Sequence, residues 1–136
     1  GKDEQVEIVY RKQQASLIVN GFSSELIQSL MILLHNAIYV CKSNIESIKH
    51  GEIFLDVTTE RQKVFISVSD NGGGIEKKNI KKIFDPYFTT KDKQNGTGLG
   101  LYILKLIVED SMNGKVSVIN GEKGAIFTIE IPKNLS

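Results

Sequence analysis

Hydrophobic and polar residues alternate along several segments of the chain, and this period of two predicts strands. The segments are 6–10, 15–19, 53–59, 64–69, 115–119 and 125–131. The polar residues 12–14 and 60–63 are predicted links between neighbouring strands, so the chain is expected to open with a hairpin. Asn120-Gly121 predicts the turn of the last hairpin, which Pro132 ends.

A period of three to four residues predicts helices. The longest helix begins at Ser23 or Ser24, ends between Cys41 and Ile48, and is stopped by Gly51. The apolar stripe that we expect to lie on a sheet comprises Leu26, Leu30, Leu33, Leu34, Ala37 and Cys41. The flank beside this stripe comprises Ser29, Ile32, Asn36 and Tyr39.

Two further helices are predicted, at 76–83 and at 99–112, and the charged segment 92–95 between them has no periodicity. The second of these helices is expected to bury Leu101, Leu104, Ile107 and Val108. Three helices with about six strands predict an α+β fold, a two-layer α/β sandwich on a mixed, mostly antiparallel sheet. The hairpins argue against a doubly wound parallel sheet.

The length of 136 residues fits one domain, 1–136, and we interpret Gly1 as an addition at an artificial start. The net charge of +1 argues against a dedicated nucleic-acid binder. No apolar run approaches the roughly 18 residues that span a bilayer, and no signal peptide is visible. We therefore expect a cytoplasmic domain, whose parent protein is free to be membrane-anchored.

Cys41 is the single cysteine, so no internal disulfide can form, which fits a reducing compartment. It lies on the apolar side of the long predicted helix, where we expect a buried, inert thiol rather than a nucleophile. His35 and His50 have no further ligands at metal-binding spacing, so we predict that neither binds a metal.

Asp70 ends a predicted strand and is followed by Asn71 and by glycines at 72–74. Asn-Gly after a strand is a common turn signal, and that interpretation stays open. The alternative is a site that reads a base, because a carboxylate accepts a hydrogen bond from an exocyclic amine such as that of adenine. Glycines would let the backbone approach a flat base or its sugar.

Asn36 is a polar residue on the flank of an apolar helix, so it is either a partly buried structural amide or a neutral oxygen ligand of Mg²⁺. A second glycine cluster, 96–101, is neither a dinucleotide fingerprint nor a P-loop. It is either a flexible linker or a helix start whose free N–H groups bind phosphate. Between the two glycine clusters, the aromatic segment 84–91 ends in Lys91. This lysine is either a cation held near phosphate or an ordinary solvated side chain, and both interpretations stay open.

The order of these motifs resembles the catalytic ATP-binding domain of bacterial sensor histidine kinases, in the GHKL ATPase superfamily. H-N-A-I at 35–38 resembles the N box, and D-N-G-G-G-I at 70–75 resembles the first glycine box. F-D-P-Y-F-T-T-K at 84–91 resembles the F box, G-T-G-L-G-L at 96–101 the second glycine box, and 124–132 the closing strand. The wording of the F box is most similar to the nitrogen-regulation type of kinase.

The resemblance implies the Bergerat fold, the cofactors ATP and Mg²⁺, and a set of site residues. Asn36 would hold Mg²⁺, Asp70 would read the adenine amine, and Lys91 would act beside the phosphates, which makes Asn36 and Lys91 the implied catalytic residues. The implied ATP site comprises Asn36, Tyr39, Asp70, Gly72, Gly74, Ile75, Phe84, Thr89, Thr90, Lys91, Gly96, Thr97, Gly98, Leu99, Gly100, Leu101 and Thr128.

Three positions depart from the family pattern. Ile32 stands where kinases often carry a second Asn and where the ATP-hydrolysing relatives carry a general-base Glu. Tyr39 replaces a frequent basic residue, and Ala125 replaces a frequent Thr. Since Ile32 cannot activate water, the resemblance implies a kinase whose nucleophile comes from elsewhere rather than a self-sufficient ATPase.

In this family the phosphoacceptor His is followed by Glu or Asp, and neither His35 nor His50 is. The implied acceptor therefore belongs to a dimerisation domain, and a response regulator would receive the phosphate afterwards. We expect the fragment to be a monomer and its parent a homodimer. Two alternatives stay open: a degenerate GHKL module that binds partners without nucleotide, and a Ser/Thr kinase of the anti-sigma-factor type.

Overall fold

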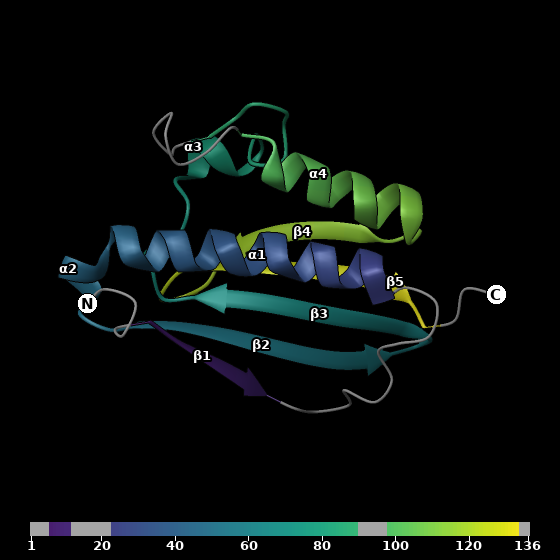
Figure 1. Ribbon diagram of the computed structural model, residues 1–136, viewed down its shortest axis with the longest axis horizontal. Coiled ribbons are helices and arrows are strands. Elements are labelled where there is room, and N and C mark those ends of the chain that lie inside the picture. The colour runs from purple at the N-terminus through teal and green to yellow at the C-terminus, as the bar shows by residue number, and fades with distance from the viewer. Residues whose placement is uncertain (1–5, 12–22, 90–97, 134–136) are drawn as a thin grey trace.

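The computed structural model describes residues 6–11, 23–89 and 98–133. Its elements, in chain order, are β1 (Val6–Arg11), α1 (Ser23–Ser43), α2 (Ile45–Ile48), β2 (Gly51–Glu60), β3 (Lys63–Asp70), α3 (Lys77–Ile80), α4 (Gly100–Leu106), η3 (Ile107–Ser111), β4 (Lys115–Asn120) and β5 (Ala125–Pro132). Five strands form one sheet in the order β1-β2-β3-β5-β4. Helices α1 and α4 lie on the same side of this sheet (Figure 1), so the predicted two-layer sandwich is confirmed.

The sheet is mixed, as predicted. β1 runs parallel to β2, and the other three neighbouring pairs are antiparallel. The predicted strand 15–19, and with it the pairing expected in an opening hairpin, lies outside the described residues. Parallel pairing of β1 with β2 requires a long crossover, and α1 and α2 supply it.

The turn predicted at 60–63 is confirmed. Glu60 pairs with Lys63, so Arg61 and Gln62 alone form the loop between β2 and β3. Their φ values are 52° and 67°, the positive angles of a mirror-image hairpin turn that matches the twist of the strands. Gln62 is held further by its carbonyl, which accepts the Lys133 N–H at 2.8 Å.

The last hairpin is confirmed and Gly121 belongs to its turn, but Asn120, which we also placed in the turn, belongs to the strand. Asn120 pairs with Ala125, so Asn120 is the last residue of β4 and the loop is 121–124. The Gly121 N–H donates to the Gly124 carbonyl at 2.8 Å and closes this loop. The Asn120 side chain bonds to the distant Ile75 backbone instead of to its own turn, which a local sequence signal does not reveal.

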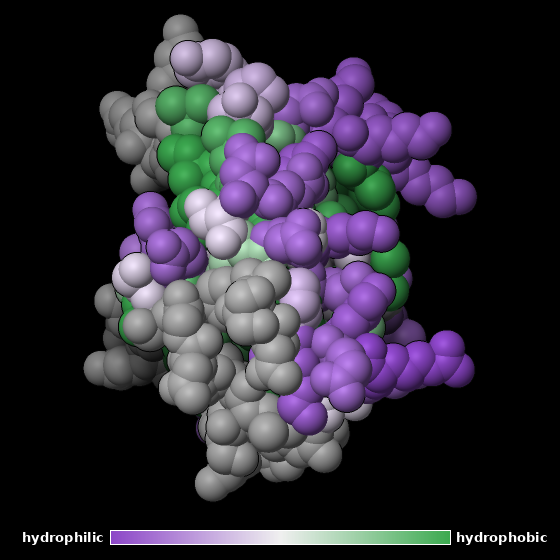
Figure 2. Space-filling model, turned by 90° about the vertical axis from the view of Figure 1, so that its right-hand side faces the viewer, coloured by the Kyte–Doolittle hydropathy of each residue, from purple (hydrophilic) through white to green (hydrophobic). Residues whose placement is uncertain are grey.

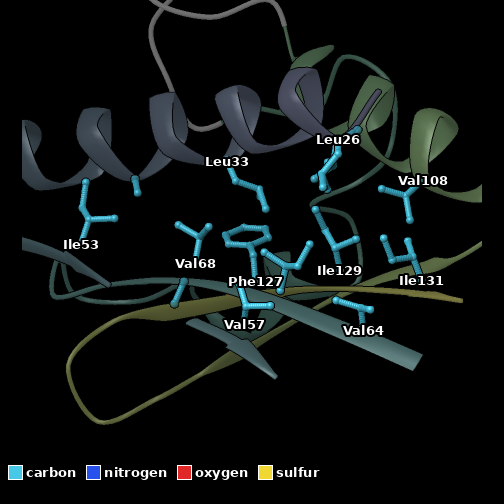
Figure 3. Packing of buried hydrophobic residues seen from close by; sticks show 14 of the residues in the cluster. Leu26, Leu33, Ile53, Val57, Val64, Val68, Val108, Phe127, Ile129 and Ile131 are labelled. Carbon is cyan, nitrogen blue, oxygen red and sulfur yellow. The ribbon is translucent and has the colours of Figure 1, made fainter. Parts of the chain in front are cut away.

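The long helix begins and ends where the pattern predicts, and Leu26, Leu33, Ala37 and Cys41 of its stripe are buried. Leu30 and Leu34 are only half-buried, because the stripe is wider than the face that touches the sheet. By length and composition alone, Ser24–Ser43 would also qualify to cross a membrane. Its buried stripe instead packs on the sheet, where Leu33 faces Phe127 and Val68 (Figure 3).

The two later helices are shorter or less regular than predicted. Only Lys77–Ile80 of the segment 76–83 is α-helical, and the predicted helix 99–112 continues beyond Leu106 as the π-helix η3. Leu104 and Val108 are buried as expected, whereas Leu101 and Ile107 are only partly buried. Met112, which the pattern did not single out, is completely buried.

Some large apolar side chains of the helical layer reach the surface. Ile27 and Met31 on α1 are 60% and 46% exposed, and Ile103 and Leu106 on α4 are 38% and 40% exposed. In the space-filling view of the end where α1 begins, hydrophilic side chains gather on one side and hydrophobic ones remain visible beside them (Figure 2). The outer surface of the helical layer therefore includes exposed apolar side chains as well as polar ones.

Leu33→Ala tests the interface between α1 and the sheet. Leu33 is fully buried, so its truncation removes apolar burial and leaves a cavity, and we expect the free energy of unfolding to fall by about 2–5 kcal/mol. Urea denaturation followed by circular dichroism measures this change. Gln28→Ala on the exposed face of the same helix is the control and should stay within about 0.5 kcal/mol. Equal effects of the two substitutions would contradict the packing described.

Candidate functional site

The carboxyl group of Asp70 is buried at the end of β3. In this strand Val64, Ile66, Val68 and Asp70 all point to the helical layer, so Asp70 continues an apolar row with an acid. The side chain is 6% exposed. Its Oδ1 accepts the Gly72 N–H at 2.8 Å, and the Ala125 N–H also donates to the carboxylate. The turn interpretation and the site interpretation of this stretch are therefore compatible.

Burial raises the pKa of the Asp70 carboxyl above its ordinary value, because desolvation disfavours the charged form. The two backbone N–H groups act in the opposite direction and lower the pKa, but they do not cancel the effect of burial. Within the described part of the chain, no Lys or Arg forms a salt bridge with Asp70. A buried acid without a cation has acceptor capacity left for a ligand that carries a hydrogen-bond donor.

Asp70 lines a pocket of about 200 Å³ between the two layers. The pocket is lined by Asn36, Val40, Asp70, Gly74, Ile75, Glu76, Asn79, Ile83, Ala125 and Phe127. These residues come from α1, from the end of β3, from the loop that follows β3, from α3 and the turn after it, and from β5. Four of them, Asn36, Asp70, Gly74 and Ile75, were predicted from the sequence, and the structure brings these four together.

Two glycines of this loop are required by close contacts. A Cβ at Gly72 would clash with the Val40 side chain on α1. Gly74 has a φ of 83°, and a Cβ there would lie 2.8 Å from the Asn120 Oδ1. The loop therefore passes closer to α1 and to β4 than a chain with side chains at these positions permits.

Asn36 projects from α1 into the same pocket and is half-buried. Among the described residues its side-chain amide has no hydrogen-bond partner. A structural amide at a partly buried position normally satisfies its own hydrogen bonds, so this geometry favours a ligand. Its Oδ1 is a hard oxygen donor of the kind that Mg²⁺ accepts, together with waters and phosphate oxygens.

The aromatic segment packs behind the pocket. The ring of Phe84 meets the ring of Phe127 edge to face, with centroids 6.1 Å apart, and Phe127 lines the pocket. Tyr87 is 73% exposed, and its N–H donates to the Gly98 carbonyl at 2.8 Å. Gly98 has a φ of 77° and no room for a Cβ beside the Tyr87 backbone. A backbone hydrogen bond thus joins the aromatic segment to the second glycine motif.

The second glycine motif leads into α4. Leu99 is the residue before the helix, and its carbonyl accepts the Ile103 N–H at 2.8 Å. Gly100 is exposed at the first helical position, and Leu101 packs partly against the core. Thr89 is exposed. Further predicted site residues lie outside the described part of the chain, namely Thr90, Lys91, Gly96 and Thr97.

Of the described residues in the predicted ATP site, only Asn36, Asp70, Gly74 and Ile75 line the pocket. The other described ones are Tyr39, Gly72, Phe84, Thr89, Gly98, Leu99, Gly100, Leu101 and Thr128. Thr128 lies on the opposite face of the sheet, where its hydroxyl is 3.3 Å from that of Ser67. Phe127 and Ile129 point to the helices, so Thr128 between them must point away; we correct the prediction and leave it out of the site. Tyr39 is half-buried on α1 but is not among the lining residues.

The sequence interpretation missed several lining residues, including Val40, Glu76, Asn79 and Ile83. They belong to no motif, although Val40 lies one helical turn after Asn36, which was a usable signal. Cys41 is buried as predicted, and burial raises its pKa. His50 has a neighbour that spacing did not reveal, since its Nε2 lies 3.4 Å from the Glu7 Oε1 at an exposed position.

Comparison with known proteins gives a consistent result. Residues 21–135 match the family described as "Histidine kinase-, DNA gyrase B-, and HSP90-like ATPase". The two-component sensor PprA of Pseudomonas aeruginosa is 35% identical over 118 residues, which cover 85% of this chain and 13% of that protein. Sporulation kinase A of Bacillus subtilis is 34% identical over 123 residues, which cover 89% of this chain and 19% of that protein.

Solved structures agree. The nucleotide-free catalytic domain of the histidine kinase ThkA matches with a TM-score of 0.78 and 34% identity, covering 97% of this chain and 83% of that domain. ThkA in complex with the response regulator protein TrrA matches with a TM-score of 0.74 and 30% identity, covering 98% of this chain and 36% of that chain. The chain spans only 13–28% of the length of the first three curated relatives.

Asp70→Asn tests the buried acid through the pH dependence of stability. The folded-state pKa of Asp70 is raised above its ordinary value, so the unfolded state releases this proton first as the pH rises. Stability is therefore lost as the pH rises above that value, and a neutral Asn escapes the loss. We expect the free energy of unfolding of the variant, relative to the natural chain, to increase between about pH 4 and about pH 7.

Urea denaturation at a series of pH values measures this difference. The exposed Asp110→Asn is the matched control, and its difference from the natural chain should not follow the same trend. A difference for Asp70→Asn that stays constant with pH, or falls as the pH rises, would contradict the raised pKa.

Proposed function

The chain belongs to the histidine kinase-, DNA gyrase B- and HSP90-like ATPase family, and we propose that it is the catalytic domain of a two-component sensor histidine kinase. In this proposal it binds Mg-ATP and donates the γ-phosphate to a histidine on a separate dimerisation domain. The observation that carries the proposal is the pocket that is lined both by the buried Asp70 and by Asn36, whose amide has no hydrogen-bond partner among the described residues.

Asp70 is proposed to bind the adenine end. Its carboxylate accepts a hydrogen bond from the exocyclic amine of adenine, whereas guanine would present a carbonyl oxygen and be repelled. Ile75 and Phe127 line the same pocket and supply apolar surface for a flat ring. Because the acid is buried, its hydrogen bond to the base is not weakened by competing water.

Asn36 is proposed to act at the phosphate end. Its amide oxygen, which has no partner among the described residues, is of the kind that Mg²⁺ accepts, and the ion would neutralise charge on the phosphates and orient the γ-phosphate. The Gly98–Leu101 entry to α4 and Lys91 are proposed to border the triphosphate. Phosphoryl transfer asks the protein mainly for positioning and charge stabilisation, so these residues need no nucleophilic group of their own.

The absence of a general base at position 32 supports a kinase over a self-sufficient ATPase. Ile32 packs partly against the core, and its Cγ2 lies 3.8 Å from the place of a Cβ on Gly100. An apolar side chain at this point cannot activate water, which would protect bound ATP from hydrolysis until an acceptor histidine arrives.

The partners and location follow from the same proposal. The phosphate would pass from the dimerisation domain to a response regulator, and ThkA has been solved with such a regulator. We propose a cytoplasmic domain, monomeric alone, in a homodimeric parent that is free to be membrane-anchored. The likeness of its F box to the nitrogen-regulation type stays a prediction.

Isothermal titration with ADP and a non-hydrolysable ATP analogue, with and without Mg²⁺, tests nucleotide binding. Asp70→Asn replaces the charged acceptor that would face the adenine amine by a neutral amide, and loss of one charged hydrogen bond should weaken ADP binding by about 10- to 100-fold. Asp110→Asn is the matched control and should bind ADP normally. No binding by the natural chain would instead favour a degenerate interaction module.

Incubation with Mg-ATP followed by intact-protein mass spectrometry at neutral pH tests the missing acceptor. His35 is exposed on α1 and His50 pairs with Glu7, and neither is followed by an acid. We expect bound nucleotide but no phosphate on the chain. Phosphate on His35 or His50 would contradict the proposal, and transfer to a serine of a partner protein would favour the anti-sigma-factor type of kinase.

A further inference from the structure

The loop that carries the predicted base-reading motif is held from outside by one side chain, that of Asn120. The Asn120 Oδ1 accepts the Ile75 N–H at 2.8 Å, and its Nδ2 donates to the Ile75 carbonyl at 2.7 Å. Both polar groups of one backbone residue are thus bound by a single amide, which has an acceptor and donors in one plane. The partners are 45 positions apart in the sequence, which makes this a tertiary contact rather than a local turn.

Two neighbouring contacts make the same connection. The Gly73 N–H donates to the Lys123 carbonyl at 3.0 Å, and the Ala125 N–H donates to the Asp70 carboxylate. The Asn120 Oδ1 also lies 2.8 Å from the place where Gly74 would carry a Cβ. The end of the β4–β5 hairpin and the loop after β3 therefore touch at successive points, and among these hydrogen bonds only those to Ile75 are made by a side chain of the hairpin.

The residues that Asn120 holds are residues of the pocket. Gly74 and Ile75 both line it, beside Asp70. Ile75 precedes α3, which begins at Lys77, and follows a strand that ends at Asp70, so it belongs to no helix or strand. Asn120 supplies the pairing that regular secondary structure would otherwise supply, and this fixes where the Ile75 side chain stands.

We propose that Asn120 is a positioning residue for nucleotide binding, which holds one wall of the base pocket through the Ile75 backbone. The inference rests on the proposed function, because it assigns a role within the same site. Asn120 does not line the pocket itself and touches no proposed ligand group. It acts by keeping Gly74 and Ile75 in place before the base arrives, so that binding does not have to order them.

A purely structural role predicts a different result. Asn120 is exposed at the end of an edge strand, where the loss of a side chain costs a fold little. If the two hydrogen bonds served only stability, their removal would change the unfolding transition and leave nucleotide affinity as it is. A positioning role predicts the reverse, with a small change in the unfolding midpoint and a clear loss of affinity.

Asn120→Ala and Asn120→Asp provide the test, with ADP as the probe. We expect Asn120→Ala to bind ADP about five- to tenfold more weakly, the effect of two exposed hydrogen bonds. Asn120→Asp keeps an acceptor for the Ile75 N–H, but it loses the donor and sets a charge against the Ile75 carbonyl, so it should also bind weakly. Ser117→Ala, exposed on the same strand, is the control and should bind normally.

Hydrogen exchange of the Ile75 amide provides the second readout. It should become faster in both Asn120 variants, while the amide of the buried Ile66 in β3 keeps its protection and reports an intact fold. Unchanged ADP affinity in Asn120→Ala overturns the inference even if Ile75 exchanges faster. If the natural chain itself binds no ADP, the proposed function fails first, and that outcome is distinct from a failure of Asn120 alone.

Discussion

The structure depends on one costly constraint, a carboxyl group buried in the row of β3 side chains that face the helices. At this position a strand of a two-layer sandwich would ordinarily place another Val or Ile. Asp70 instead keeps two backbone N–H donors and no cation among the described residues, and its pKa is raised by burial. An acid held in this way destabilises the free protein and gains most when a ligand donates to it. The other features of the pocket either hold Asp70 or shape the space before it.

The loop after Asp70 is fastened on both sides. Toward β2, the Asn71 Oδ1 accepts the Glu52 N–H at 2.8 Å and its Nδ2 donates to the His50 carbonyl at 2.9 Å. Toward β4, Asn120 binds the Ile75 backbone. Two asparagines, one within the motif and one distant from it, thus replace regular secondary structure on either side of the glycines. A glycine-rich loop can then approach a ligand closely without the disorder that its composition would suggest.

Much of the fold could be predicted because one face of each element is buried. The alternation in β3 and the stripe on α1 follow directly from that burial, and the turn at 60–63 follows from their spacing. Parity along β5 would also have excluded Thr128, since its neighbours Phe127 and Ile129 point inward. The prediction placed Asn120 in the turn because its side chain bonds to the backbone of Ile75, which is 45 positions away in the sequence and gives no local signal. The parallel pairing of β1 is likewise set by the crossover and not by its own residues.

The residues of the candidate site also differ in whether the sequence could predict them. Asn36, Asp70 and Gly74 could be named from motifs, because a chemical role requires those residue types. Val40 could have been found from its place one helical turn after Asn36. Asn79 and Ile83 could not, because any residue of suitable shape can line a wall, and only folding brings them to the pocket. Asn120 belongs to a third kind, a residue that acts on the site without reaching it.

Nitrogen and proton chemical-shift mapping of the isotopically labelled chain during titration with ADP tests the central claim most directly. The pocket predicts that the largest changes fall on the backbone amides that surround Asp70, namely those of Gly72, Gly74, Ile75 and Ala125. The amide of Val64, near the opposite end of β3 from Asp70, should change little. Changes centred on that opposite end of the sheet, or none at saturating ADP, would contradict the assignment of this pocket to an adenine nucleotide.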